Sequence, residues 1–74
     1  MIMPEDNAIY AQVYIVVENA GYDSECDVRT FNSAAAAWRW MKKHYNHDEL
    51  DPSHPDCLHV EVCREINGNR TYDF

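Results

Sequence analysis

The stretch that decides the fold reads Ala-Ile-Tyr-Ala-Gln-Val-Tyr-Ile-Val-Val-Glu and covers residues 8–18. It is rich in β-branched and aromatic residues, which favour a pleated, partly buried strand. Successive side chains of a strand point to opposite faces. The face that we predict to lie against the core carries Ile9, Ala11, Val13, Ile15 and Val17. The opposite, amphipathic face, predicted to lie under a loop or in solvent, carries Tyr10, Gln12, Tyr14 and Val16.

A turn and a second strand follow this stretch. Residues 19–24 contain turn-forming residues and a glycine, so we expect the chain to reverse direction there. Residues 25–31 then alternate between polar and less polar side chains, which predicts a hairpin with one solvated face. Cys26 falls on the inner face of this strand, so we predict it to be a small core residue.

An amphipathic helix comes next. Ser33 precedes four alanines and is well placed to cap a helix that runs to about Tyr45. At about 100° per residue, one broad arc of this helix holds Ala34, Ala37, Trp38, Trp40, Met41, His44 and Tyr45. The two tryptophans lie at opposite borders of the arc, so a narrow core contact cannot bury both. We predict that Trp38 and Tyr45 are core residues and that Trp40 is partly exposed.

The remaining chain predicts a loop and a second hairpin. Residues 47–56 hold two prolines and four acids, which favours an irregular loop. A third strand follows, with its inward side formed by Leu58, Val60 and Val62.

The dipeptide Asn67-Gly68 is a strong hairpin signal. A two-residue loop there would leave Asp73 beside Val62 on the core face. A three-residue loop with a bulge avoids this, and it would pair Arg64 with Tyr72 and Val62 with Phe74. We therefore predict the bulged register.

Together these segments predict an α+β fold with the order ββαββ. One amphipathic helix packs on an antiparallel four-stranded sheet. The 74 residues have room for one domain, residues 1–74, and the pattern leaves the order of the strands in the sheet open.

The net charge and the cysteines indicate which partners and which cellular compartment are expected. Thirteen acidic residues against six basic ones give a net charge of −7, which repels nucleic acids and anionic membranes and attracts a basic protein surface. The three cysteines cannot all pair within the chain, and residues 1–6 lack the pattern of a secretory signal. We therefore expect a cytoplasmic protein with reduced thiols.

Residues 44–63 contain six side chains that can ligate zinc, namely His44, His47, His54, Cys57, His59 and Cys63. They contain no Cys-x-x-Cys pair, and their spacing matches no standard zinc motif. We therefore predict neither a metal nor a cofactor, and a zinc module built from residues 44–63 stays as an alternative.

Catalysis is not predicted. Cys57 and His59 could form a nucleophile and base on one strand face, but a chain of 74 residues leaves little room to enclose a substrate. No glycine-rich phosphate loop is present, since the chain has two glycines.

Acidic clusters and aromatic side chains point instead to a protein-binding surface. Aromatic residues dominate binding energy at interfaces, and charges around them select the partner. The candidate partner-binding residues are Asp23, Glu25, Asp27, Asp48, Glu49, Asp51, Asp56, Tyr10, Tyr14, Tyr22 and Trp40. The outer side of the predicted helix differs from them because Arg39, Lys42 and Lys43 make it locally basic.

The chain resembles small phage-encoded inhibitor proteins of the anti-CRISPR type. The resemblance lies in its size, its acidity, the strand of residues 10–18 and the helix entry Phe31-Asn32-Ser33-Ala34. It implies a non-catalytic protein that blocks a nucleic-acid-handling complex by occupying a basic surface. A homodimeric structural protein is a further alternative.

Overall fold

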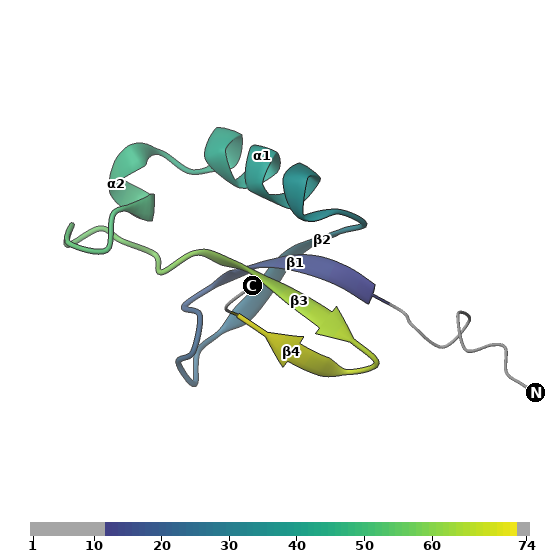
Figure 1. Cartoon of the computed structure of the whole chain (residues 1–74). Coiled ribbons are helices and arrows are strands. Elements are labelled where there is room, and N and C mark those ends of the chain that lie inside the picture. The colour runs from purple at the N-terminus through teal and green to yellow at the C-terminus, as the bar shows by residue number, and fades with distance from the viewer. Residues whose placement is uncertain (1–11, 73–74) are drawn as a thin grey trace, which may run out of the picture.

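The computed structural model describes residues 12–72. Its elements follow one another in the order β1 (Gln12–Glu18), β2 (Cys26–Phe31), α1 (Ala34–His44), α2 (His47–Leu50), β3 (Glu61–Ile66) and β4 (Asn69–Thr71). The strands form one antiparallel sheet in the order β2-β1-β3-β4, and α1 covers one face of it (Figure 1). The predicted α+β fold is confirmed, with a short second helix added to it. Neither helix is long and apolar enough to cross a membrane.

The core between α1 and the sheet is small and apolar. Val16 and Val62 pair across β1 and β3, and they are almost fully buried. Ala37, Met41 and Tyr45 pack onto them from the helix and its C-terminal cap. Because alanine has no side chain beyond Cβ, the first turns of the helix can approach the sheet closely.

The opposite face of the sheet is also buried. Ile15 and Val17 of β1 pack with Cys63 of β3, and none of the three is more than 4% exposed. The predicted burial of Ile15 and Val17 is therefore confirmed. The prediction for the other face of β1 was wrong at Val16, which is fully buried because α1 packs on that side. Ile9, Tyr10 and Ala11 lie outside the described residues.

Helix α1 begins as predicted. The Ser33 hydroxyl accepts a hydrogen bond from the backbone N–H of Ala36 at 3.2 Å, which satisfies one of the unpaired donors of the first turn. The assignment of Trp38 to the core, however, was wrong. Trp38 is 42% exposed, whereas Trp40 is half-buried between the rings of Phe31 and His44. The end of β2 supplies a partner on the Trp40 side of the helix, which the helical periodicity could not reveal.

Residues 46–60 are more ordered than the predicted loop. Asn46 and Glu49 form a capping box, with both hydrogen bonds at 2.9 Å, and this box opens the short helix α2. Residues 57–60 then run without regular structure, and β3 begins at Glu61. Leu58 and Val60 still pack against the helix-side core, as predicted.

The final hairpin has the two-residue loop, so the predicted bulged register was wrong. Asn67 and Gly68 both have positive φ, at 52° and 87°, as a type I′ turn requires. Arg64 consequently pairs with Thr71, and Glu65 pairs with Arg70. This register gives Arg70 carboxylate partners across the sheet. Asp73 and Phe74 lie outside the described residues.

The first hairpin contains a bulge, and Cys26 lies beyond it at the strand end. The register between β1 and β2 shifts between Val16 and Val17, so that Val16 pairs with Arg29 and Val17 pairs with Asp27. Val28 is the extra residue. Cys26 is exposed at the start of β2, which contradicts its predicted place in the core.

Candidate functional site

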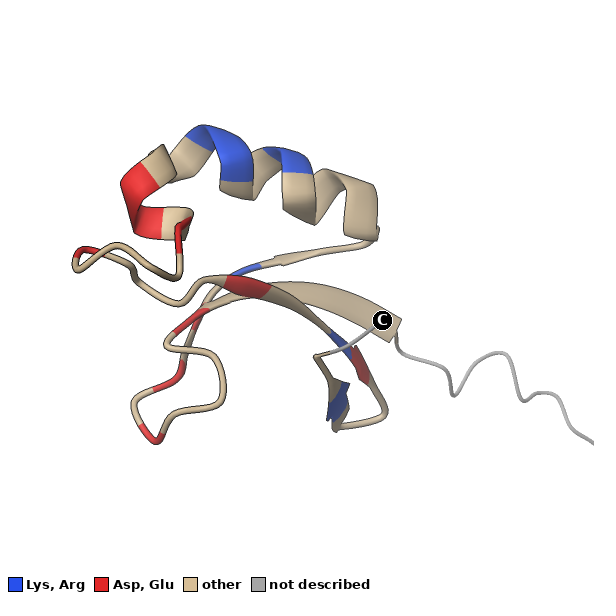
Figure 2. Ribbon diagram, turned by 60° about the vertical axis from the view of Figure 1, so that its left-hand side comes forward, with Lys and Arg blue, Asp and Glu red and all other residues tan. Residues whose placement is uncertain are grey.

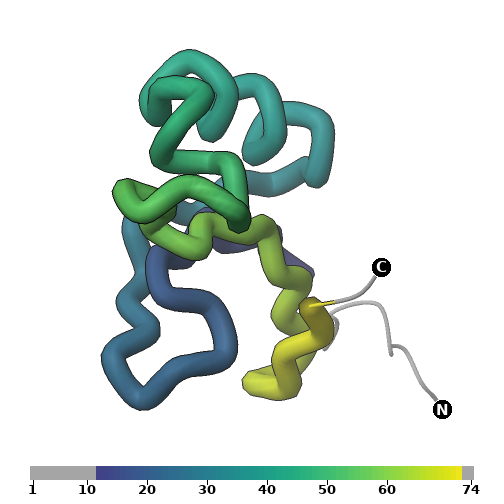
Figure 3. Tube along the Cα trace, turned by 90° about the vertical axis from the view of Figure 1, so that its left-hand side faces the viewer, coloured from purple at the N-terminus to yellow at the C-terminus, as the bar shows by residue number. Residues whose placement is uncertain are grey.

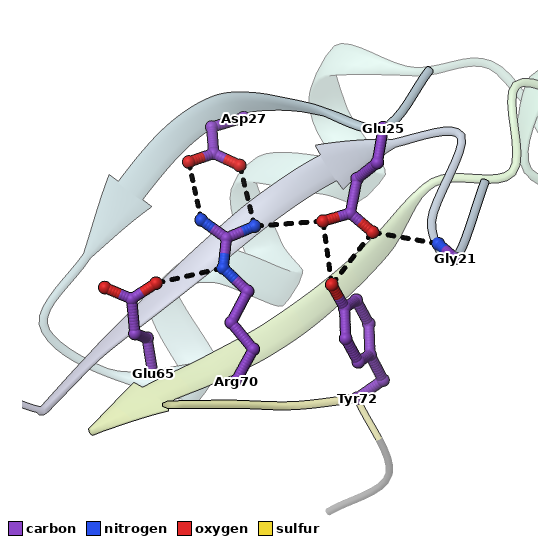
Figure 4. Close-up of polar contacts among 6 residues, drawn as sticks. All are labelled: Gly21, Glu25, Asp27, Glu65, Arg70 and Tyr72. Atoms are coloured by element: carbon purple, nitrogen blue, oxygen red, sulfur yellow. Dashed lines mark hydrogen bonds and ion pairs between the residues drawn. The ribbon is translucent and has the colours of Figure 1, made fainter. Parts of the chain in front are cut away.

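One cluster of polar side chains joins the two outer strands of the sheet. The Arg70 guanidinium on β4 donates two hydrogen bonds to the Asp27 carboxylate on β2, from Nη1 at 2.8 Å and from Nη2 at 2.7 Å, in a bidentate contact (Figure 4). The same guanidinium donates to Glu65 at 2.9 Å and to Glu25 at 3.0 Å. Tyr72 donates its hydroxyl hydrogen to the Glu25 carboxylate. We call these five residues the Arg70 cluster.

The Arg70 cluster spans the sheet because the sheet is curved. The β1–β2 turn and the β3–β4 hairpin both project on the side away from α1 (Figure 3). Since β2 and β4 are the two outer strands, the Arg70–Asp27 contact crosses the face that holds Cys63 and Ile15. Burial raises the pKa of the Cys63 thiol, and charges of the Arg70 cluster act on it. The cluster therefore closes the second apolar face.

Two predicted partner-binding acids belong to this cluster. The pKa of Glu25 is lowered, first by the backbone N–H of Gly21, which donates at 2.8 Å, and then by Tyr72. The pKa of Asp27 is lowered by its hydrogen bonds from Arg70. Both carboxylates are therefore held ionised by partners within the chain, and they are poorly available to another protein.

The lowered pKa values predict an acid-sensitive fold. A carboxyl group with a lower pKa in the folded than in the unfolded chain stabilises the fold above its unfolded pKa. This stabilisation is complete above about pH 5, and it declines as pH falls through the ordinary values of 4.5 for Glu25 and 3.8 for Asp27. Urea unfolding would measure the free energy of unfolding between pH 7 and 3. This free energy should fall more steeply with decreasing pH for the wild type than for the double variant Glu25→Gln/Asp27→Asn.

The matched control for this comparison neutralises two exposed acids outside the cluster, Asp23→Asn and Asp56→Asn. It changes the net charge by the same amount, and its free energy of unfolding should fall with decreasing pH as steeply as that of the wild type. Equal slopes for the wild type and the Glu25→Gln/Asp27→Asn variant would contradict the prediction.

Carboxylates gather at one end of the molecule, where three segments meet. Backbone hydrogen bonds join the β1–β2 turn to the segment before β3, from Asn19 to Leu58 at 2.9 Å and from Ala20 to His59 at 3.0 Å. A further bond of 2.9 Å joins Leu58 to Glu49 of α2. Residues 18–25 and 46–61 thus lie together, and they hold eight carboxylates and no lysine or arginine. Figure 2 shows this separation from the basic residues of α1.

Some of these acids have structural roles. Glu49 completes the capping box of α2. Asp51 accepts hydrogen bonds from the backbone N–H and the hydroxyl of Ser53, at 2.9 and 2.8 Å, and these bonds lower its pKa. These local partners appear only in the folded chain, so composition alone does not distinguish Glu49 and Asp51 from the other acids.

Four further acids of these segments are exposed to solvent, and so is one aromatic ring. Tyr22 is 57% exposed, and its ring centre lies 5.1 Å from that of His59. The exposed acids of this region are Asp23, Asp48, Asp56 and Glu61. Asp48 lies on α2, in the same layer as α1, so we call Tyr22 and the other three acids, Asp23, Asp56 and Glu61, the acidic end. It includes Glu61, which was not among the predicted binding residues.

Two of the other predicted aromatic anchors pack against the core. Tyr14 and Trp40 are half-buried and pack against the helix-side cluster. Tyr10 lies outside the described residues. Of the four predicted aromatics, Tyr22 is therefore the one that the described structure places on the surface as a free anchor.

The residues weighed as metal ligands are dispersed. His44 stacks on Trp40, with ring centres 4.3 Å apart. Cys63 is buried on the sheet face away from α1, and the His54 ring lies 3.6 Å from the carboxylate of Asp48. Among residues 12–72, no three histidine, cysteine or acidic side chains gather as metal ligands would.

Cys57 and His59 are close to one another, although they do not lie on a strand. The Cys57 sulfur accepts the backbone N–H of His59 at 3.3 Å and lies 3.9 Å from Nδ1 of its ring. His59 also has a positive φ of 50°. No pocket that could hold a substrate is found beside them in the described part of the chain.

Comparison with known proteins gives no relative on which to base a function. No protein-family model, no curated protein and no solved structure matches this chain.

Proposed function

We propose that this protein is a non-catalytic binding protein whose acidic end docks on a basic surface of another protein. The observation that carries the proposal is the charge separation, with eight carboxylates and no lysine or arginine in the segments that meet there. Exposed Tyr22 in the β1–β2 turn supplies the aromatic anchor that such interfaces use, and the acids of the acidic end favour rapid encounter with a basic partner.

The basic surface is proposed to be one that normally binds nucleic acid. Such surfaces are dense in lysine and arginine because they neutralise phosphates. An acidic domain that occupies one would act as an inhibitor of the phage-encoded, anti-CRISPR kind, without any chemical step. A nucleic acid should compete with this protein for the same surface.

Affinity capture from a bacterial lysate tests the proposal. The wild type, immobilised at low salt, should retain a nucleic-acid-binding protein that added duplex DNA or RNA displaces. The variant Asp23→Asn/Asp56→Asn/Glu61→Gln should retain roughly tenfold less of it, because charges around an interface govern encounter. Failure of the wild type to retain such a protein would contradict the proposal.

A matched control separates local charge from net charge. The variant Gln12→Lys/Thr30→Lys/Asn69→Lys has the same net charge as the neutralised one, but its changes lie at exposed strand positions away from the acidic end. It should capture the partner nearly as well as the wild type. Equal losses in both triple variants would show that only net charge matters.

A further inference from the structure

The outer side of α1 is an unpartnered surface of unusual composition for this acidic chain. Trp38 is 42% exposed there, beside the exposed cations Arg39, Lys42 and Lys43. The helix itself contains no acidic residue. Within residues 12–72, none of these three cations forms an ion pair with another side chain.

The charge along the helical layer changes sign. The basic residues of α1 are followed directly by α2, whose Asp48 side chain is 58% exposed. Figure 2 shows the two helices side by side, with lysine and arginine on one and acids on the other. The basic C-terminal half of α1 and the acidic α2 therefore lie next to each other, and an antiparallel second copy would set each of them against the opposite charge.

We propose that this helical layer is the interface of a symmetric dimer, with α1 of each copy against α2 of the other. In a two-fold symmetric dimer each contact occurs twice. Lys42 of one copy would therefore face Asp48 of its partner at two equivalent places in the interface. The exposed Trp38 ring would be covered in the process. Tryptophan and arginine are the residues most often found at the energetic centre of interfaces.

Other occupants fit this surface less well. Direct stacking of two α1 helices would place like charges against each other. A nucleic acid offers only negative charge, so it would repel Asp48 of α2, whereas a second copy offers lysine to Asp48 and aspartate to Lys42. At about 0.15 M salt, screening beyond roughly 8 Å weakens the long-range repulsion between two copies, while close charge pairs persist.

The dimer can be tested with charge-reversed variants and with a mixture of them that restores opposite charges. Sedimentation velocity in 0.15 M salt, at up to about 500 µM protein, would measure association. The wild type should sediment at twice the chain mass of 8.7 kDa as its concentration rises. Lys42→Glu and Asp48→Lys should each raise the dissociation constant at least tenfold, because each change acts twice. An equimolar mixture of the two variants should dimerise again to within about threefold of the wild type, since opposite charges then face each other at both contacts.

The variant Trp38→Ser should also prevent dimerisation, and circular dichroism would establish that each variant is folded. A wild type that stays monomeric over the whole range would overturn the proposal. The proposal would also be overturned if neither charge reversal changed the dissociation constant of the dimer. The same holds if the mixture of the two variants failed to dimerise. None of these variants alters the three acids neutralised in the capture experiment, so the two proposals fail independently.

Discussion

Replacing Arg70 with methionine is expected to lower the free energy of unfolding by about 2–3 kcal/mol. The substitution leaves three carboxylates, Glu25, Asp27 and Glu65, close together without their shared cation. Loss of one partner of a buried ionic network costs more than this, but here the groups are partly exposed and solvent reduces the cost. For a domain of this size, the melting temperature should fall by roughly 10–20 °C.

Thermal and urea unfolding at pH 7 would measure the effect of Arg70→Met. Arg70→Lys keeps the charge but loses the planar donor arrangement that contacts Asp27 twice, so an intermediate loss is expected. Adding Glu25→Gln and Asp27→Asn to Arg70→Met should recover part of the stability by removing the unpaired charges. A melting temperature unchanged by Arg70→Met would show that the cluster does not hold the outer strands together.

The two tryptophans are expected to respond in opposite ways to truncation. Trp40→Ala should lower the free energy of unfolding by about 2 kcal/mol, because a large half-buried ring is lost. That ring packs against Phe31 and His44, and the Arg29 guanidinium lies 5.7 Å from its centre. Trp38→Ala should change the stability of the monomer by less than about 0.5 kcal/mol.

Unfolding of both tryptophan variants, at protein concentrations low enough to keep the chain monomeric, would provide the comparison. Each variant is the control for the other, since the residue type, the helix and the replacement are the same. A larger loss for Trp38→Ala than for Trp40→Ala would contradict the packing of α1 described above.

The sequence was most informative where local physical chemistry decides the structure. The capping hydroxyl of Ser33, the period of the helix and the β-branched run before Glu18 each act within a few residues. For this reason the order ββαββ could be predicted. The short helix α2 was also within reach, because Asn46 and Glu49 have the spacing of a capping box.

Features that depend on distant partners could not be predicted. The burial of Val16 depends on the face of the sheet that α1 covers. The exposure of Cys26 accompanies a bulge that alternation within one strand does not reveal. The predicted register at Asn67-Gly68 was wrong because the observed one is favoured by the contact between Arg70 and Asp27. These residues are 43 positions apart, so the contact is not visible in the local sequence.

The candidate site was only partly predictable for the same reason. Composition located the acids, but it did not distinguish those with structural partners, such as Glu25 and Asp51, from those free to meet another protein, such as Asp23. Tyr22 was among the predicted aromatic anchors, and it is exposed in the β1–β2 turn. Trp38 was assigned to the core, and its exposure became visible only in the folded chain.

The central position of β1 in the sheet also bears on how the chain assembles. Its pairing with β3 joins residues between 44 and 54 positions apart, from Val17–Glu61 to Gln12–Ile66. The two hairpins, by contrast, close over short turns. Closing a long loop costs more configurational entropy than closing a short one. The two hairpins meet in the sheet only through the β1–β3 pair, so neither half of the chain holds a complete sheet and the domain folds as one cooperative unit.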